Sequence, residues 1–378
     1  MPRTEPAVVI VGAGAAGLSA GAALKRQGID AVLLERDDRI GGTWARRYER
    51  LRLHTVRGFS GLAHRPLPRS LPRYVPKDIY ADYLQQYAEA FGLRVELNRP
   101  VQTIRPAEEG LWEIAPLKGP PLRSQVVIVA TGNYNEPVLP EWPGMNGFAG
   151  RIVHSSEYRS GRDFAGQAVL VVGIGNSGAE IAADLVEQGA SRVAIAVRTS
   201  PPIMPRQLFG VVPVQLVGIA LTPIPAPGLI DRAGAVARRV AIGDLSKYGL
   251  GQAAWGPFTA RRPAVIDVGF LKELKARKIE VRPAFERFTR SGVVFGDGHE
   301  EEFDAVVAAT GFSTGLARLL EVRDTLRENG RPRFRSGRPT PHAGLYFIGF
   351  DETTRGVLFE ANRDSKRLAR AVRSYLDA

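Results

Sequence analysis

Two glycine-rich motifs lie about half a chain apart, and each follows an apolar run. Their six glycines are Gly12, Gly14 and Gly17 in the first motif, and Gly173, Gly175 and Gly178 in the second. In such motifs the first glycine permits a tight turn and the second lets the backbone approach a pyrophosphate. The third lets the following helix pack on the strand, which leaves the phosphates at the helix N-terminus. Two copies predict two dinucleotide cofactors, with electrons or a hydride passing between them.

An acidic residue follows the first motif at the distance expected for a ribose contact. The run 31–34 is typical of a strand, and it ends at Glu35. A carboxylate there accepts the two ribose hydroxyls of adenosine and repels a 2′-phosphate. The first site is therefore predicted to hold FAD or NAD. The alternative is a structural glycine turn beside a surface glutamate.

The second motif is followed by basic and hydroxyl side chains instead. The predicted strand 192–197 leads into Arg198 and Thr199, with Arg206 as a second basic candidate. A guanidinium beside hydroxyls matches a 2′-phosphate, which favours NADPH and leaves NADH possible. The alternative is that Arg198 is an ordinary surface arginine.

Composition excludes several classes of function. The 378 residues include no cysteine, so the chain lacks the redox-active cysteine pair of the disulfide reductases and any thiolate metal site. The five histidines show no metal-ligand spacing, and we expect no metal. The net charge of +12 is spread along the chain rather than gathered in one block, so we expect no nucleic-acid partner.

Strand-like and helix-like runs alternate, which predicts an α/β protein with two Rossmann-like domains. We expect an FAD domain over 1–146, an inserted NADPH domain over 147–302, and the return of the FAD domain over 303–378. Two similar tripeptides mark the crossings between these domains and bring backbone close to the cofactors. Their candidate cofactor residues are Thr131 and Gly132 in the first tripeptide, and Thr310 and Gly311 in the second. Asn133, Asn135 and Asn176 are the polar candidates near the junction of the two rings, and Asn133 and Asn176 are candidate catalytic groups, although asparagine is more often a turn or cap residue. Ser177 is a further cofactor-binding candidate.

Some local elements are also predicted. A helix is expected over 78–91 with Asp78 as its cap and Ile79, Tyr83 and Leu84 on its buried face. A strand is expected over 95–104 and a final helix over 363–376.

The segment 207–230 carries no charge and contains several prolines. The prolines argue against a spanning helix, and we favour a lid over a substrate tunnel, with a membrane-surface patch as the alternative. The first predicted strand begins at once, without a signal peptide, and we expect a cytoplasmic protein.

Between the glycine motifs, Phe148, Gly150, His154 and Tyr158 form a pattern that resembles the identifying motif of the class B flavin-containing monooxygenases. The final tyrosine resembles their monooxygenase branch rather than the Baeyer–Villiger branch, which usually ends in tryptophan. Three stretches are similar to the plant YUCCA-type monooxygenases, namely 48–55, 265–269 and 355–358. The stretch 41–44 is closer to bacterial and animal relatives, but the asparagine that follows it in some of them is replaced by Ala45 and Arg46.

The resemblance implies FAD, NADPH, dioxygen and a small organic substrate. NADPH would reduce the flavin, and a flavin 4a-peroxide would insert one oxygen atom, by N/S-oxygenation or by oxidative decarboxylation of a 2-oxo acid such as indole-3-pyruvate. The alternatives are a flavin-dependent reductase or oxidase that passes electrons to a partner or to dioxygen, and a redox sensor. Trp44 either covers the flavin or packs in the core. His154 is a candidate base, but a role in the linker between the domains is favoured.

Overall fold

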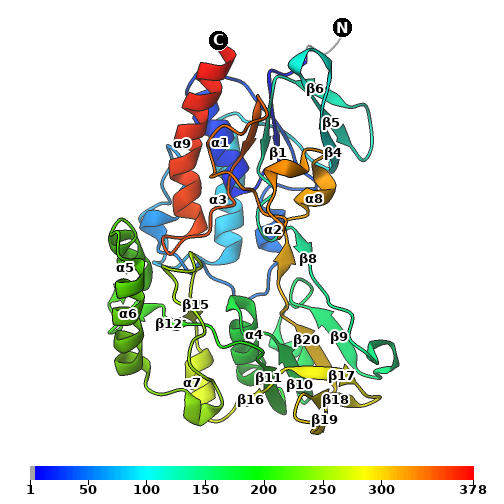
Figure 1. Cartoon of the computed structure of the whole chain (residues 1–378), viewed down its shortest axis with the longest axis vertical. Helices are drawn as coiled ribbons and strands as arrows, with labels where there is room; N and C mark the ends of the chain where they lie inside the picture. Colours follow the sequence, from blue (N-terminus) through cyan, green and yellow to red (C-terminus); the bar gives the residue numbers. More distant parts are fainter. Residues whose placement is uncertain (1–4) are drawn as a thin grey trace.

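The computed structural model describes residues 5–378. It shows two sheets of parallel strands, which lie one after the other along the long axis of the molecule (Figure 1). The first sheet runs, in spatial order, β22 (Leu345–Phe347), β7 (Val126–Val129), β1 (Val8–Val11), β2 (Val32–Leu34) and β3 (Arg94–Glu96). The second runs β16 (Glu280–Arg282), β11 (Arg192–Ala196), β10 (Ala168–Val172), β20 (Ala305–Ala308) and β9 (Arg151–His154). All neighbouring strands in both sheets are parallel. The expected α/β class with two Rossmann-like domains is confirmed.

The side chains of each central strand point alternately to the two faces of the sheet, and each face packs in its own hydrophobic core. In β1, Val8 and Ile10 pack with helices α1 (Ala15–Lys25), α3 (Lys77–Ala90) and α9 (Val357–Leu376). Val9 and Val11 point to the other face, which the antiparallel sheet β4 (Val101–Pro106), β5 (Trp112–Pro116) and β6 (Leu122–Ser124) covers. Both faces of the parallel sheet are thus buried, which is why its strands are continuous apolar runs.

The second domain repeats this arrangement. One face of its sheet packs on α4 (Asn176–Glu187) and α7 (Phe270–Lys275). The other face is covered by the antiparallel sheet β17 (Phe285–Phe288), β18 (Gly292–Phe295) and β19 (Glu300–Glu302). The two domains differ in the origin of one edge strand. In the first sheet this strand is β22, which follows all the other strands of that sheet in sequence, whereas in the second it is β9, which precedes all the others.

The chain crosses between the domains through two short linkers that pair with each other. Strand β8 (Glu136–Pro137) lies antiparallel to β21 (Phe312–Ser313). The sequence placed the return to the first domain at residue 303, but β20 belongs to the second sheet, between β10 and β9. The chain therefore returns only after Ala309, because the apolar run that follows residue 303 is a central strand of the inserted domain.

Several local predictions were wrong in their bounds. Helix α9 begins at Val357, directly after Gly356, and so before the predicted start at residue 363. The expected strand 95–104 is interrupted, because Asn98 has a φ of 54° and Pro100 follows. Helix α3 has no side-chain cap from Asp78. Ile79 is exposed, and Tyr80 is buried in its place.

The longest departure from the repeated plan is an insertion in the second domain, between β12 (Ile203–Pro205) and its parallel neighbour β15 (Val265–Asp267). It contains the hairpin β13 (Gln207–Leu208) and β14 (Val212–Pro213), followed by helices α5 (Val214–Leu221) and α6 (Pro227–Ile242). Figure 1 shows α5 and α6 at the outer left edge of the molecule. The two remaining α-helices are short, α2 (Gly42–Ala45) and α8 (Leu316–Leu319).

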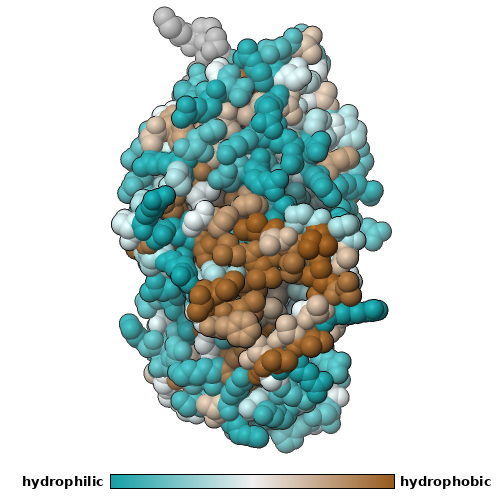
Figure 2. Space-filling view, turned by 90° about the vertical axis from the view of Figure 1, so that its left-hand side faces the viewer, coloured by the Kyte–Doolittle hydropathy of each residue, from teal (hydrophilic) through white to brown (hydrophobic). Residues whose placement is uncertain are grey.

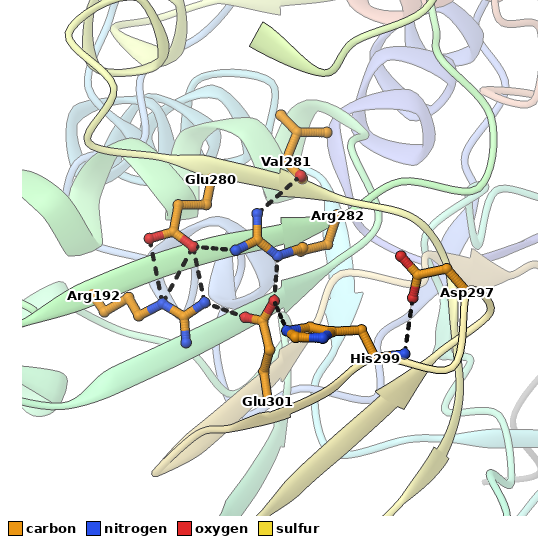
Figure 3. Close-up of polar contacts among 7 residues, drawn as sticks. All are labelled: Arg192, Glu280, Val281, Arg282, Asp297, His299 and Glu301. Atoms are coloured by element: carbon orange, nitrogen blue, oxygen red, sulfur yellow. Dashed lines mark hydrogen bonds and ion pairs between the residues drawn. The ribbon is translucent and has the colours of Figure 1, made fainter.

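An ion network joins the two sheets of the second domain (Figure 3). Arg192 of β11 and Arg282 of β16 both bind Glu280, at 2.8 and 2.6 Å, and both also contact Glu301 of β19. Burial alone would raise the pKa of Glu301, but the hydrogen bonds from the two guanidinium groups leave this pKa lowered. The pKa of Glu280 is lowered too, chiefly by its hydrogen bond from Arg192. Every carboxylate of the network is paired, so we assign it a structural role.

We predict that Glu301→Gln lowers the free energy of unfolding by about 1–2 kcal/mol at neutral pH, because two partly buried guanidinium groups lose a shared carboxylate. A carboxylate with a lowered folded pKa stabilises above its unfolded value and loses that effect as pH falls through the folded pKa. The difference between the wild type and the variant should therefore shrink in acid. Urea unfolding from pH 7 to pH 3 measures it, with the exposed Glu108→Gln as control, and a constant difference would contradict the assignment.

Candidate cofactor and active site

The first glycine motif forms a tight turn in which two of the three glycines have no room for a side chain. Gly12 has a φ of 105°, and a Cβ there would lie 2.8 Å from the carbonyl oxygen of Ala130. A Cβ on Gly17 would overlap the carbonyl oxygen of Gly12 itself. A Cβ on Gly14, in contrast, would meet nothing within 4 Å. Gly14 is the N-cap of α1, so the open space lies where backbone N–H groups face outward and can bind a phosphate.

The second motif has the same geometry. Gly173 has a φ of 98°, and its Cβ would lie 2.7 Å from the carbonyl oxygen of Ala309. A Cβ on Gly178 would overlap the Gly173 carbonyl, and Gly175, the N-cap of α4, again faces open space. Both motifs fit a dinucleotide pyrophosphate.

The two Ala-Thr-Gly tripeptides lie at equivalent positions in the two domains. Ala130 and Ala309 are the residues that pack against the glycine turns, and Gly132 and Gly311 both have positive φ values and open space where a Cβ would be. Each tripeptide directly follows the strand beside the motif strand, β7 or β20, at the carboxyl edge of the sheet. The sequence predicted that the two tripeptides mark the crossings between the domains. In the structure each tripeptide leads into one of the two linkers.

Glu35 lies at the end of β2 beside the first motif. Its two carboxylate oxygens accept hydrogen bonds from the backbone N–H groups of Ala13, at 2.7 Å, and Asp37, at 3.1 Å. Burial raises the pKa of Glu35, and these two hydrogen bonds oppose that shift. The carboxylate is thus held rigidly at the motif, with further acceptor positions on both oxygens.

Two buried polar atoms near the first motif lack a partner within residues 5–378. They are Oγ1 of Thr131 and Oδ1 of Asn133, both at the carboxyl end of β7. The Asn133 amide donates to the carbonyl oxygen of Phe350 at 3.1 Å, which fixes its orientation. Buried polar atoms are normally paired, so the two orphaned oxygens fit a missing ligand at this edge. Trp44 packs its ring on Tyr80, with centroids 4.9 Å apart, and remains half-buried.

The basic candidates of the second domain lie in different surroundings. Arg198 and Thr199 follow β11 with exposed side chains. Arg206 is half-buried, and its guanidinium carbon lies 4.3 Å from the centroid of the Tyr74 ring. Burial lowers the pKa of Arg206, against the favourable charge of Glu180. Asn176 accepts a hydrogen bond from Ile266 N at 2.8 Å, which attaches the start of α4 to β15.

His154 lies in the seam between the domains. Its Nδ1 accepts from the backbone N–H of Ser156 at 3.1 Å, and its Nε2 lies 3.0 Å from the carbonyl oxygen of Gly311. Burial lowers the pKa of His154. One ring nitrogen is therefore engaged by the turn after β9 and the other by the start of the returning linker, which supports a linking role over that of a base.

The other residues of the Phe-Gly-His-Tyr pattern are equally structural. Phe148 packs on Phe288, a Cβ on Gly150 would approach the Asp304 carbonyl oxygen, and the Tyr158 hydroxyl donates to Asp184 at 2.6 Å.

A buried acid in α4 was missed by the sequence analysis. Glu180 lies two residues after Gly178, its side chain is 1% exposed, and it contacts Nε2 of His54 from the first domain. Its Oε2 is buried without a partner among residues 5–378. Burial and the nearby Glu180 carboxylate both raise the pKa of the Tyr48 phenol, which is itself buried in the core of the second domain. Acids at 180 and 184 within the otherwise small and apolar run 178–186 were the available signal.

Two further properties bear on function. Within residues 5–378, no three His, Cys, Asp or Glu side chains come together as metal ligands. None of the helices in that range combines the length and hydropathy that a bilayer crossing requires.

Two dinucleotide-binding domains joined by paired linkers define a nucleotide-dependent oxidoreductase, and comparisons with known proteins narrow this class. The pyridine nucleotide-disulphide oxidoreductase family matches residues 9–206, although a chain without cysteine cannot form a redox disulfide. The chain is 38% identical over 366 residues to indole-3-pyruvate monooxygenase YUCCA1 of Oryza sativa, which covers 93% of this chain and 88% of that protein.

Two solved structures share the fold. A mutant flavin monooxygenase from Stenotrophomonas maltophilia superposes with a TM-score of 0.77 at 25% identity, covering 98% of this chain and 99% of that one. OTEMO in complex with FAD and NADP superposes with a TM-score of 0.76 at 17% identity, covering 99% of this chain and 87% of that one. The chain belongs to the class B flavin-containing monooxygenases.

The open glycines give a prediction for each site. Gly14→Ala should leave the stability of the flavin-free protein nearly unchanged, while lowering FAD affinity about tenfold or more, because the methyl group fills the phosphate space. Gly175→Ala should keep the flavin and weaken NADPH binding similarly. Flavin content and coenzyme titration measure both effects. Gly17→Ala is the contrasting variant, expected to destabilise the fold by about 1–3 kcal/mol, and equal behaviour of all three would contradict the assignment.

The contact between His54 and Glu180 gives a second prediction. His54→Ala should leave a buried carboxylate without its partner, and a double-mutant cycle with Glu180→Gln should show a coupling of about 1–3 kcal/mol in urea unfolding. Additive effects of the two substitutions would show that the contact does not hold the domains together.

Proposed function

We propose that the chain is an NADPH- and FAD-dependent monooxygenase, with FAD in the first domain and NADPH in the second, that oxygenates a small organic substrate. When bound, FAD supplies the redox chemistry by which NADPH and dioxygen oxygenate a substrate. The solved structure of OTEMO, which shares the fold, is that of a complex with FAD and NADP. In this chain the N-termini of α1 and α4, with their open glycines, would hold the two pyrophosphates.

The remaining cofactor contacts follow from the same geometry. Glu35 would bind the ribose of FAD, and Thr131, Gly132 and Asn133 would approach its ring end. Asn176, Ser177 and the pair Arg198 and Thr199 would bind NADPH, the last two at its 2′-phosphate. Thr310 and Gly311 would line the second site as Thr131 and Gly132 line the first.

The substrate class is the finer part of the proposal. We favour oxidative decarboxylation of a 2-oxo acid such as indole-3-pyruvate, with N- or S-oxygenation as the broader capacity of the same site. The relative that is 38% identical is an indole-3-pyruvate monooxygenase, and the match covers 93% of this chain.

One structural observation supports this choice above the others. The three stretches that resemble YUCCA-type enzymes, far apart in sequence, come together where the domains meet. Arg50 donates to the carbonyl oxygen of Val268 at 2.9 Å, and a Cβ on Gly356 would lie 2.6 Å from Cγ2 of Thr55. Gln215 of α5 accepts from Val56 N at 2.8 Å and donates to the carbonyl oxygen of Arg355 at 2.7 Å. The inner side of α5 thus packs over this junction, where it would help to exclude water, as oxygenation requires.

The experiment is incubation of the holoenzyme with NADPH, dioxygen labelled with oxygen-18, and one substrate at a time: indole-3-pyruvate, a thioether, an amine or a ketone. For the 2-oxo acid we expect one NADPH and one dioxygen consumed per carbon dioxide released, and one labelled oxygen in the acid that is one carbon shorter. The second labelled oxygen leaves as water. Consumption of NADPH with stoichiometric hydrogen peroxide and no labelled product on any substrate would overturn the proposal in favour of an oxidase.

The coenzyme assignment has its own prediction. Arg198→Ala should raise the KM for NADPH about 10- to 100-fold, because a charge-assisted hydrogen bond contributes about 1.5–3 kcal/mol, and should leave the KM for NADH nearly unchanged. The exposed Arg290→Ala, in the same domain, is the matched control. An equal increase for both coenzymes would show that Arg198 does not contact the 2′-phosphate.

A further inference from the structure

The most exposed large apolar side chains of residues 5–378 all lie on the insertion between β12 and β15. They are Phe209 (88% exposed), Val240 (81%), Leu229 (69%), Val236 (67%) and Val211 (66%). Figure 2 shows apolar residues gathered on the face of the molecule that carries α5 and α6. We call Phe209, Val211, Leu229, Val236 and Val240 the insertion patch. Monomeric soluble proteins rarely expose an apolar area of this kind without a partner for it.

Helix α6 presents its apolar stripe outward. Leu229, Val236 and Val240 are spaced by seven and four residues, which places them on one face of the helix. Of the helix, only Ile242 is buried. A surface helix of a globular protein normally buries such a stripe, so the outward stripe of α6 is built for contact with something else.

The hairpin beside α6 projects an aromatic ring from the same face. Phe209 has a φ of 51°, a conformation that bulky residues rarely adopt, and Gly210 follows at a φ of 70°. Arg73 of the first domain donates to the carbonyl oxygen of Val211 at 3.2 Å and holds the tip in place. The backbone strain therefore supports a projecting aromatic side chain rather than a buried one.

The inner side of the insertion is firmly attached, so the patch cannot simply fold inward. A Cβ on Gly218 would overlap the carbonyl oxygen of Thr354. Within the insertion, the Asp231 carboxylate accepts hydrogen bonds from Phe258 N at 3.0 Å and Thr259 N at 2.8 Å, which hold α6 to the segment before β15. The sequence predicted a lid over a substrate tunnel. In the structure one side of the insertion packs over the domain junction, and the other side faces outward.

The insertion that carries the patch is basic. The range 207–264 contains Arg232, Arg238, Arg239, Lys247, Arg261 and Arg262, against Asp231 and Asp244 as its only acids. Asp231 is engaged with backbone N–H groups, and Asp244 lies 3.9 Å from Arg239. Arg232 and Arg239 each follow a patch residue by three positions, so both flank the stripe of α6. Guanidinium groups beside an exposed apolar stripe match an anionic lipid surface. Two copies of this chain would instead bring like charges together.

We propose that the insertion patch docks on an anionic lipid bilayer surface, with its apolar side chains at the boundary of headgroups and acyl chains and the flanking arginines on lipid phosphates. Helix α6, of 16 residues, would lie in the plane of the surface. The docking does not depend on which substrate the enzyme oxygenates.

The test is sedimentation of the holoenzyme with phosphatidylcholine vesicles that either contain or lack phosphatidylglycerol. We expect binding to the anionic vesicles, weakened by salt, and about tenfold weaker binding for each of Val236→Glu and Val240→Glu. Leu117→Glu is the matched control, because Leu117 is an exposed apolar residue of the first domain, outside the patch. Flavin content and melting temperature of each variant show that the fold is retained.

Three results would overturn the proposal. One is absence of binding to anionic vesicles, and another is binding that Leu117→Glu weakens as much as the patch substitutions do. The third is a dimer of the wild type in light scattering that Val240→Glu dissociates, since the patch would then be covered by a second copy.

Discussion

The close approach of a strand and the helix that follows it is the contact on which both sites depend. In each domain the carbonyl oxygen of the first motif glycine occupies the place where the third would carry its Cβ. Only glycine at Gly17 and Gly178 allows this approach, and the Cβ atoms of Ala130 and Ala309, at the end of the neighbouring strand, lie close to the same two positions. The result is a helix whose first N–H groups face an open space at the edge of the sheet. Strands, helices and tripeptides are all arranged around that space.

The second organising feature is the seam between the domains. Tyr48 of the first domain is buried in the core of the second, where its ring meets Tyr158 edge to face. His154 binds the returning linker, and Arg47 lies over Phe312 of the same linker. Two residues of the family pattern, His154 and Tyr158, thus help to fix how the two sheets face each other. Chemistry that must pass between two bound nucleotides depends on this alignment as much as on the nucleotide contacts.

The sequence predicted the features that depend on local chemistry. The two motifs, their strands and the acid at Glu35 follow from the conformations open to glycine and from apolar runs, and the structure contains them. Elements that depend on distant contacts were predicted less well. Ile79 has the hydrophobicity of a core residue but lies on the outer face of α3, because Tyr80 fills the core instead. The strand after residue 303 could not be assigned to the second sheet from its composition alone, since either sheet would accept an apolar run. Glu180 and His54 are 126 positions apart, and nothing local indicates that they meet.

The different origin of the outermost strand in the two sheets, β22 in the first and β9 in the second, has a consequence for synthesis on the ribosome. All strands of the second sheet lie between Arg151 and Ala308, so that domain can complete itself while the rest of the chain is still being made. The first sheet must wait for β22 and α9, which follow every strand of the second sheet along the chain. Until then, its apolar surface beside β7 is uncovered. The domain that begins first therefore matures last, and a nascent chain arrested before α9 would carry one finished domain and one open to aggregation or to chaperones.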